Sequence, residues 1–155
     1  MEILDIQSYD GRNIYCHRPV IRAIVDLGYY YDVPTRDIKG FNESLTECFP
    51  GIKSHYCSTG YEGGFYDRLL EGTYLAHVTE HLILELQNMV GCDVTYGRTR
   101  LHEGKSIYEI IFEYKVRRLA IECLLAGIMT VNKLISGSTP DTDEIIEHLN
   151  MVASR

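Results

Sequence analysis

The sequence predicts a single domain with an α+β fold. Residues typical of β-strands form two groups, at 3–27 and 93–114, and segments with helical periodicity lie between and after them. A chain of 155 residues, 45% of them hydrophobic, is long enough to bury one core.

The first half of the chain contains two predicted strands and two short helices. Turn residues at 10–13 separate the strands, and Pro50-Gly51 closes the first helix. The glycine-rich stretch 57–65 lacks phosphate-loop spacing and is interpreted as a tight connection. The strands are expected at 3–6 and 20–27, and the helices at 41–48 and 66–70.

Residues 77–81 have the sequence His-Val-Thr-Glu-His, which is the order of the inverted zinc-protease motif. On a helix, positions four apart lie on one face, so His77 and His81 would offer nitrogens to one ion with Glu80 beside it. Zinc binds neutral imidazoles, and a nearby carboxylate can accept the proton of an attacking water. The motif therefore predicts a metal site with its own general base.

A helix at 74–90 is expected to carry this motif. One side of the helix is apolar, and the other presents the motif residues together with Glu85. Thr73 is the predicted N-cap and Gly91 the predicted C-terminal stop. The apolar positions are Leu75, Val78, Leu82, Leu86 and Met89.

The second half of the chain is expected to form a hairpin followed by two helices. The hairpin pairs 93–100 with 106–114 around a turn at 102–105. A long apolar helix at 116–135 is separated by polar and turn residues from a last helix at 141–152.

Alternation along the second hairpin strand places Glu109 and Glu113 on one face with apolar residues. Carboxylates in such a setting cost free energy unless a positive group lies against them. A metal ion would satisfy them, and so would Arg98 or Arg100 from the partner strand.

Composition excludes several classes of protein. The net charge of −7 and the lack of a basic stripe disfavour nucleic-acid binding. No segment is apolar enough to span a membrane, and residues 1–5 do not resemble a signal peptide, so a cytoplasmic protein is expected. The five cysteines are odd in number and have no C-x-x-C spacing, which argues against disulfides; most are expected to be buried.

Several motifs together resemble the N-terminal domain of cyanophycin synthetases, over most of residues 1–136. Residues 137–155 match only weakly and are interpreted as a linker and a C-terminal helix. The matching segments are Pro34, Gly40-Phe41, Pro50-Gly51, Cys57-Ser58, Gly63-Gly64-Phe65, Glu71 to Tyr74, His77 to His81, Glu85-Leu86-Gln87, Gly97 to Arg100 and Phe112-Glu113-Tyr114.

The resemblance implies a function and a core architecture. Cyanophycin is a polymer with an aspartate backbone and an arginine joined to each side-chain carboxyl. In the family, this domain binds the polymer and resembles a metallopeptidase that cuts the backbone into primers for synthesis. ATP-grasp and Mur-ligase-like domains follow it in the synthetase and are absent from this chain. By analogy with inverted-motif metallohydrolases, helices should pack on one face of an antiparallel sheet.

The resemblance also implies roles for individual residues. His77 and His81 match the ligands of zinc or another divalent metal, and Glu80 matches the general base. Glu113 is the expected third ligand, because it belongs to the matching Phe-Glu-Tyr segment. Glu109 and Glu85 are the alternatives, and an ion pair with Arg98 or Arg100 is the structural role left open for Glu113.

Arg98 and Arg100 would bind negative charge on the polymer, and Arg100 would support the developing oxyanion. Tyr74 is either a hydrogen-bonding partner of the substrate or a packing residue. Two other functions stay open at this point: a cysteine hydrolase using Cys57 near His55, and a module that tethers the polymer without cutting it. The sequence leaves open the metal's identity and whether the protein is a homo-oligomer.

Overall fold

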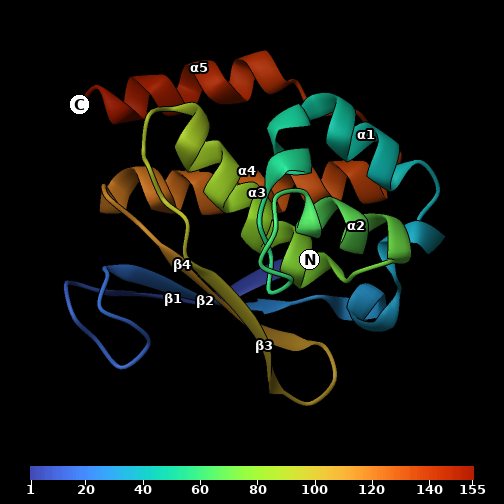
Figure 1. The fold of residues 1–155 in the computed structure, drawn as a ribbon, viewed down its shortest axis with the longest axis horizontal. Helices are drawn as coiled ribbons and strands as arrows, with labels where there is room; N and C mark the ends of the chain where they lie inside the picture. Colours follow the sequence, from blue (N-terminus) through green and yellow to red (C-terminus); the bar gives the residue numbers. More distant parts are fainter.

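The computed structural model describes residues 1–155 and contains one four-stranded antiparallel sheet with helices on one face (Figure 1). The strands follow the order β1-β2-β4-β3, which places β1 and β3 at the edges. This arrangement confirms the α+β class. The strands are β1 (Glu2–Tyr9), β2 (Val20–Asp26), β3 (Gly97–Glu103) and β4 (Ile107–Glu113).

Five α-helices form two layers above the sheet. In Figure 1, α3 and α4 lie next to the sheet, and α5 runs along the outer side of α4. Three short 3₁₀ helices connect the elements of the first half, at Gly28–Asp32, Thr35–Asp37 and Pro50–Ser54. The α-helices are α1 (Phe41–Cys48), α2 (Gly64–Glu71), α3 (Leu75–Met89), α4 (Arg117–Ile135) and α5 (Thr142–Ala153).

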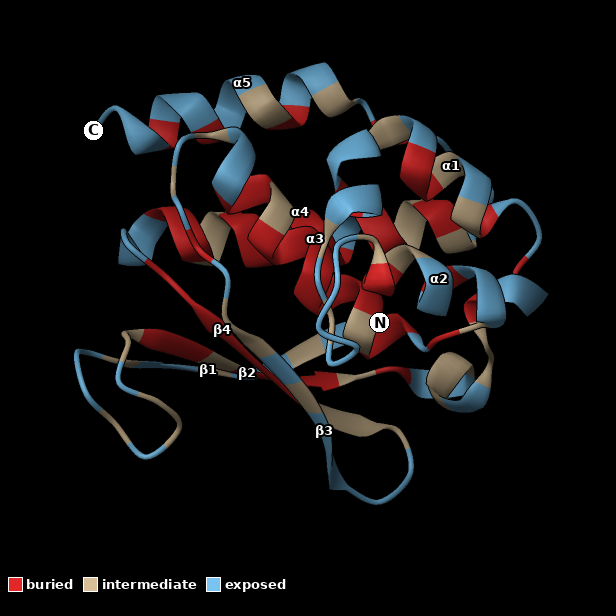
Figure 2. Ribbon diagram, in the orientation of Figure 1, coloured by how far each residue is buried: buried red, intermediate tan, exposed pale blue.

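The core lies between the sheet and the α3–α4 layer, where many of the residues are coloured as buried in Figure 2. Alternate residues of the central strands point into it, such as Ile21 and Val25 of β2 and Ile110 and Phe112 of β4. The intervening residues of β4, which include both glutamates, therefore face the other side of the sheet. This assignment of faces decides which predicted residues can reach the motif on α3.

The hairpin differs from its prediction at the start of β3, which begins at Gly97 rather than at residue 93. Side chains hold the preceding residues in place of a strand ladder. Asn88 on α3 bonds both the N–H and the C=O of Val94, and the Glu113 carboxylate accepts from the N–H groups of Thr95 and Tyr96. The segment before β3 is thus tied to the end of α3 by Asn88 and to the end of β4 by Glu113.

The cysteines are free, and only Cys123 is buried. The expectation that most cysteines are buried was therefore wrong. None of the helices combines the length and the apolar character that crossing a bilayer requires.

Candidate metal centre

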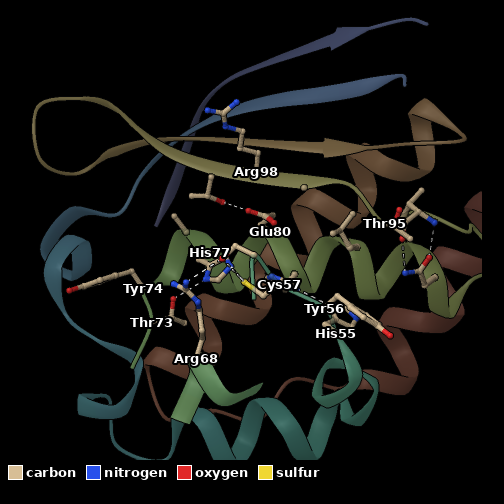
Figure 3. A pocket seen from close by; sticks show the side chains of 18 of the residues that line it. His55, Tyr56, Cys57, Arg68, Thr73, Tyr74, His77, Glu80, Thr95 and Arg98 are labelled. Atoms are coloured by element: carbon tan, nitrogen blue, oxygen red, sulfur yellow. Dashed lines mark hydrogen bonds between the residues drawn. The ribbon is translucent and has the colours of Figure 1, made fainter. Parts of the chain in front are cut away.

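Helix α3 confirms the predicted helix almost to its ends and presents the motif to a cavity of about 810 Å³. The motif face is not an exposed polar surface, because Glu80 and His81 are only 6% and 4% exposed. Helix α2 and the loop after the third 3₁₀ helix cover it, and the ring of Phe65 stacks on His81 with centroids 3.8 Å apart. The cavity lies between this cover, α3 and strand β3 (Figure 3).

His77 is held by two neighbours (Figure 3). Its Nδ1 lies 2.9 Å from Oγ1 of Thr73, and its Nε2 lies 3.4 Å from Sγ of Cys57. Thr73 is not the N-cap that the sequence predicted, since Tyr74 occupies that position without a capping side-chain bond. Burial, reinforced by the charge of Arg68, lowers the pKa of His77 to about 4. The imidazole is therefore neutral at pH 7 and has a lone pair available.

Three potential ligand atoms meet in the cavity. One atom each from Cys57, His77 and His81 lies within 4.8 Å of the other two. Burial lowers the pKa of His81 to about 2, and the neighbouring His77 and His55 act in the same direction. A thiol and two neutral imidazoles are donors that suit zinc and similar divalent metals. Cys57 thus supplies a third donor that the sequence prediction assigned elsewhere.

A chain of contacts extends from His81 away from Cys57. Nδ1 of His81 lies 3.1 Å from Nδ1 of His55, and Nε2 of His55 lies 2.7 Å from Oε2 of Glu85. Both His55 and Glu85 are nearly buried, at 15% and 12% side-chain exposure. Glu85, one of the alternative ligands, therefore contacts His55 instead of the three potential donors.

Glu80 reaches across to strand β3. Oγ1 of Thr99 donates to its Oε2 at 2.5 Å, and the backbone of Gly97 lies against its Oε1. Burial raises the pKa of Glu80 to about 7, although the hydrogen bond from Thr99 acts in the opposite direction. Glu80 is thus a buried carboxylate between the two histidines in sequence and outside the group of potential ligands.

Glu113 is not brought to the histidines. It faces the other side of the sheet, where its carboxylate accepts hydrogen bonds from Arg18 at 2.7 Å and Lys115 at 2.8 Å. Burial by itself would raise the pKa of Glu113, but Lys115, the backbone N–H groups of Thr95 and Tyr96, and Arg18 together lower it to about 2. The expectation of Glu113 as third ligand does not agree with this arrangement, because strand alternation points its side chain away from α3.

Glu109 lies on the same outer face and pairs with Arg22 and Arg100. The sequence left open whether a metal ion or an arginine of the partner strand lies against the two glutamates. For Glu109 it is an arginine, Arg100. Arg100 is engaged there rather than in the cavity. Arg98 is among the residues that line the cavity, although in Figure 3 its side chain points away from Glu80.

Arg68 on α2 also lines the cavity, opposite β3. One of its amino groups donates to Oγ of Ser58 at 3.2 Å, which leaves most of its five N–H donors free. Tyr74 also lines the cavity and is 44% exposed. No sequence pattern singled out Arg68, because its position depends on how α2 packs over α3.

The sequence analysis did not assign other contributors to the site the contacts that they make. Thr73 and Thr99 bond motif side chains, and His55 and Gly97 make close contacts with them. The available signal was that Gly97 and Thr99 fall in one of the segments that carry the family resemblance. Cys57 falls in another, but no ligand-spacing rule connects a cysteine to histidines 20 and 24 positions later.

Comparisons with known proteins agree with the resemblance seen in the sequence. Residues 22–136 match the family model described as cyanophycin synthase-like N-terminal domain. Cyanophycin synthetase of Crocosphaera subtropica is 40% identical over 152 residues, and that of Geminocystis herdmanii is 34% identical over the same length. Each alignment covers 97% of this chain and 17% of the relative.

Cyanophycin synthetase of Trichormus variabilis is 40% identical over 117 residues, which cover 74% of this chain and 13% of that protein. The chain therefore spans less than a fifth of the length of these relatives. Since the family model covers most of the chain and includes the whole of α3, this protein belongs to the family of cyanophycin synthase-like N-terminal domains.

Proposed function

We propose that this domain is a metal-dependent hydrolase that cuts the backbone of cyanophycin into short primers for synthesis. The observation that carries the proposal is the meeting of Cys57, His77 and His81 in one cavity beside the buried carboxylate of Glu80. Each of these groups is held by neighbouring side chains in a way that suits its role.

The residues present fit a divalent metal. Nδ1 of His77 faces Thr73 and Nδ1 of His81 faces His55, so Nε2 of each ring is the nitrogen left for a ligand. Sγ of Cys57 already lies near Nε2 of His77. A metal bound by these three residues would supply Lewis acidity and lower the pKa of a water molecule.

The protein groups supply proton transfer and substrate binding. Glu80 accepts the proton of the attacking water and returns it to the leaving amine. Thr99 and Gly97 hold its carboxylate against β3, which fixes the direction of that transfer. Arg68 lies where it can bind a carboxylate of the polymer. It is close enough to His77 for its charge to lower the pKa of that residue, and its remaining N–H donors are free.

The relatives support the proposed substrate and its larger context. Those proteins are cyanophycin synthetases, so the proposed partners of this domain are the polymer and the ATP-dependent ligase domains of a synthetase. Cutting existing chains would provide the ends from which such a ligase extends new polymer.

The test compares wild-type protein with Glu80→Gln, using cyanophycin, added zinc and analysis of fragment length. Glutamine keeps the shape of Glu80 but cannot accept the proton, so hydrolysis should slow by about 10²-fold or more. Zinc content should be unchanged, because Glu80 is not among the proposed ligands.

Glu62→Gln is a suitable control, since Glu62 is an exposed residue of the glycine-rich loop. Wild-type protein that binds cyanophycin but produces no shorter fragments would contradict the hydrolase. A non-catalytic module that tethers the polymer to synthetase domains would then be the better account.

A further inference from the structure

Glu85 contacts His55, and His55 contacts His81, although neither Glu85 nor His55 has a part in the proposed hydrolysis. They form a line from His81 outward: His81 Nδ1, His55 Nδ1, then His55 Nε2 and Glu85 Oε2. Neither residue is among the potential ligands. Their close contact at low exposure therefore needs an explanation of its own.

The hydrogen-bond chemistry of this line is directional. An ionised carboxylate only accepts, so Nε2 of His55 carries the proton that it donates to Glu85. Nδ1 of a neutral His55 is then an acceptor, and Nδ1 of His81 must be the donor to it. The remaining nitrogen of His81, Nε2, is left without a proton and available as a ligand.

We infer that Glu85 and His55 are positioning residues that fix the tautomer and ring orientation of His81 for metal binding. Outer partners of this kind commonly orient histidine ligands and raise their basicity. The inference rests on the proposed function in that it takes His81 as a ligand. It adds that the ligand depends on Glu85, four positions further along α3.

The backbone at Gly51 packs closely against the carboxylate of Glu85. A Cβ at Gly51 would lie 2.1 Å from Oε1 of Glu85, closer than two atoms can approach. Gly51 does not adopt a positive φ, so steric contact with Glu85 is what restricts this position. His55 follows in the same segment, and its carbonyl accepts from the N–H of Phe65, the residue that stacks on His81.

The line also joins two parts of the site. His55 lies two residues before Cys57, and its contacts with Glu85 and His81 hold this part of the loop against α3. Loss of the Glu85 carboxylate should therefore disturb His81 directly and Cys57 through the loop.

The test uses Glu85→Gln and Gly51→Ala, which remove the carboxylate or displace it while leaving all three proposed ligands in place. Zinc affinity is measured on the full chain by competition with a chromophoric chelator. Both variants should bind zinc about 10-fold to 100-fold more weakly than wild type. Circular dichroism checks the fold, and if Glu85→Gln does not fold, Gly51→Ala decides.

The matched control is Glu122→Gln. Glu122 contacts His148 at 3.2 Å between α4 and α5, so this change also removes the carboxylate partner of a histidine, but outside the cavity. Zinc affinity should be unchanged in this variant.

A second readout needs no metal. In metal-free wild type, ¹⁵N chemical shifts of the His81 ring should show the proton on Nδ1, and in Glu85→Gln they should show a mixture of tautomers. Unchanged shifts and unchanged zinc affinity in both variants would overturn the positioning role and leave the hydrolase standing. If the wild type shows the expected tautomer but binds no zinc, the metal site is contradicted. The hydrogen-bonded line from Glu85 through His55 to His81 would then still stand.

Discussion

A Cβ at Gly97 would lie 2.5 Å from Oε1 of Glu80, so the Glu80 carboxylate on α3 occupies the space that a side chain at position 97 of β3 would need. Gly97 does not have a positive φ, and the restriction is therefore steric rather than conformational. The proposed general base fits against β3 because residue 97 has no side chain, while Thr99 of the same strand donates a hydrogen bond to it.

Gly97→Ala should displace Glu80 and slow hydrolysis of cyanophycin by about 10²-fold, approaching the loss expected for removal of the base. Zinc content should remain that of wild type, because the three proposed ligands are untouched. Fragment analysis and metal analysis on the same preparation check this result. Glu103→Ala, at an exposed position of β3 outside the cavity, should retain activity; equal activity of the two variants would argue against close packing at Gly97.

Cys57→Ala should weaken zinc binding by more than the roughly 10-fold to 100-fold expected for loss of a supporting hydrogen bond. Its Sγ is one of the three atoms that converge in the cavity. Cys92→Ala is the control, since Cys92 is also a partly exposed free thiol but lies outside the group. Equal zinc affinity of the two variants would remove Cys57 from the ligand set.

Glu113→Gln should lower the free energy of unfolding by about 1–3 kcal/mol at pH 7, because a buried carboxylate with several donors is lost. Zinc content should not change, since Glu113 faces the other side of the sheet. Denaturant unfolding and metal analysis measure the two effects. Loss of zinc with unchanged stability would instead support Glu113 as a ligand.

The same carboxylate makes stability depend on pH. The pKa of Glu113 is about 2 in the folded protein and near its ordinary value of 4.5 when unfolded. Its contribution is therefore fully present above about pH 4.5 and is lost as the pH falls toward 2. In denaturant unfolding at a series of pH values, the difference between wild type and Glu113→Gln should shrink across this range; a constant difference would contradict the assignment.

Arg68→Gln should raise the KM for cyanophycin about tenfold with a smaller effect on kcat, which corresponds to one charge-assisted hydrogen bond to the substrate. Arg100→Gln is the control, because Arg100 carries the same charge but pairs with Glu109 on the outer face of the sheet and does not line the cavity. Steady-state kinetics on polymer of defined length separate the two parameters. A larger effect of Arg100→Gln would return polymer binding to the outer face of the sheet.

The sequence alone was sufficient for the features that depend on local periodicity. Spacing of four predicted that His77 and His81 share a helix face, and strand alternation predicted that Glu109 and Glu113 share a sheet face; both hold in the structure. Helix and strand geometry determine such relationships within a few residues. The limits of α3 were also predicted to within one residue, although Tyr74 and not Thr73 is its N-cap.

Tertiary structure decided which of these faces meet. Cys57 joins the histidines because the loop after the third 3₁₀ helix folds over α3, whereas Glu113 is excluded because β4 turns it away from that helix. The line from Glu85 through His55 to His81 depends on the same packing. Contacts between segments distant in sequence depend on how whole elements pack, and no periodicity within a single element encodes them.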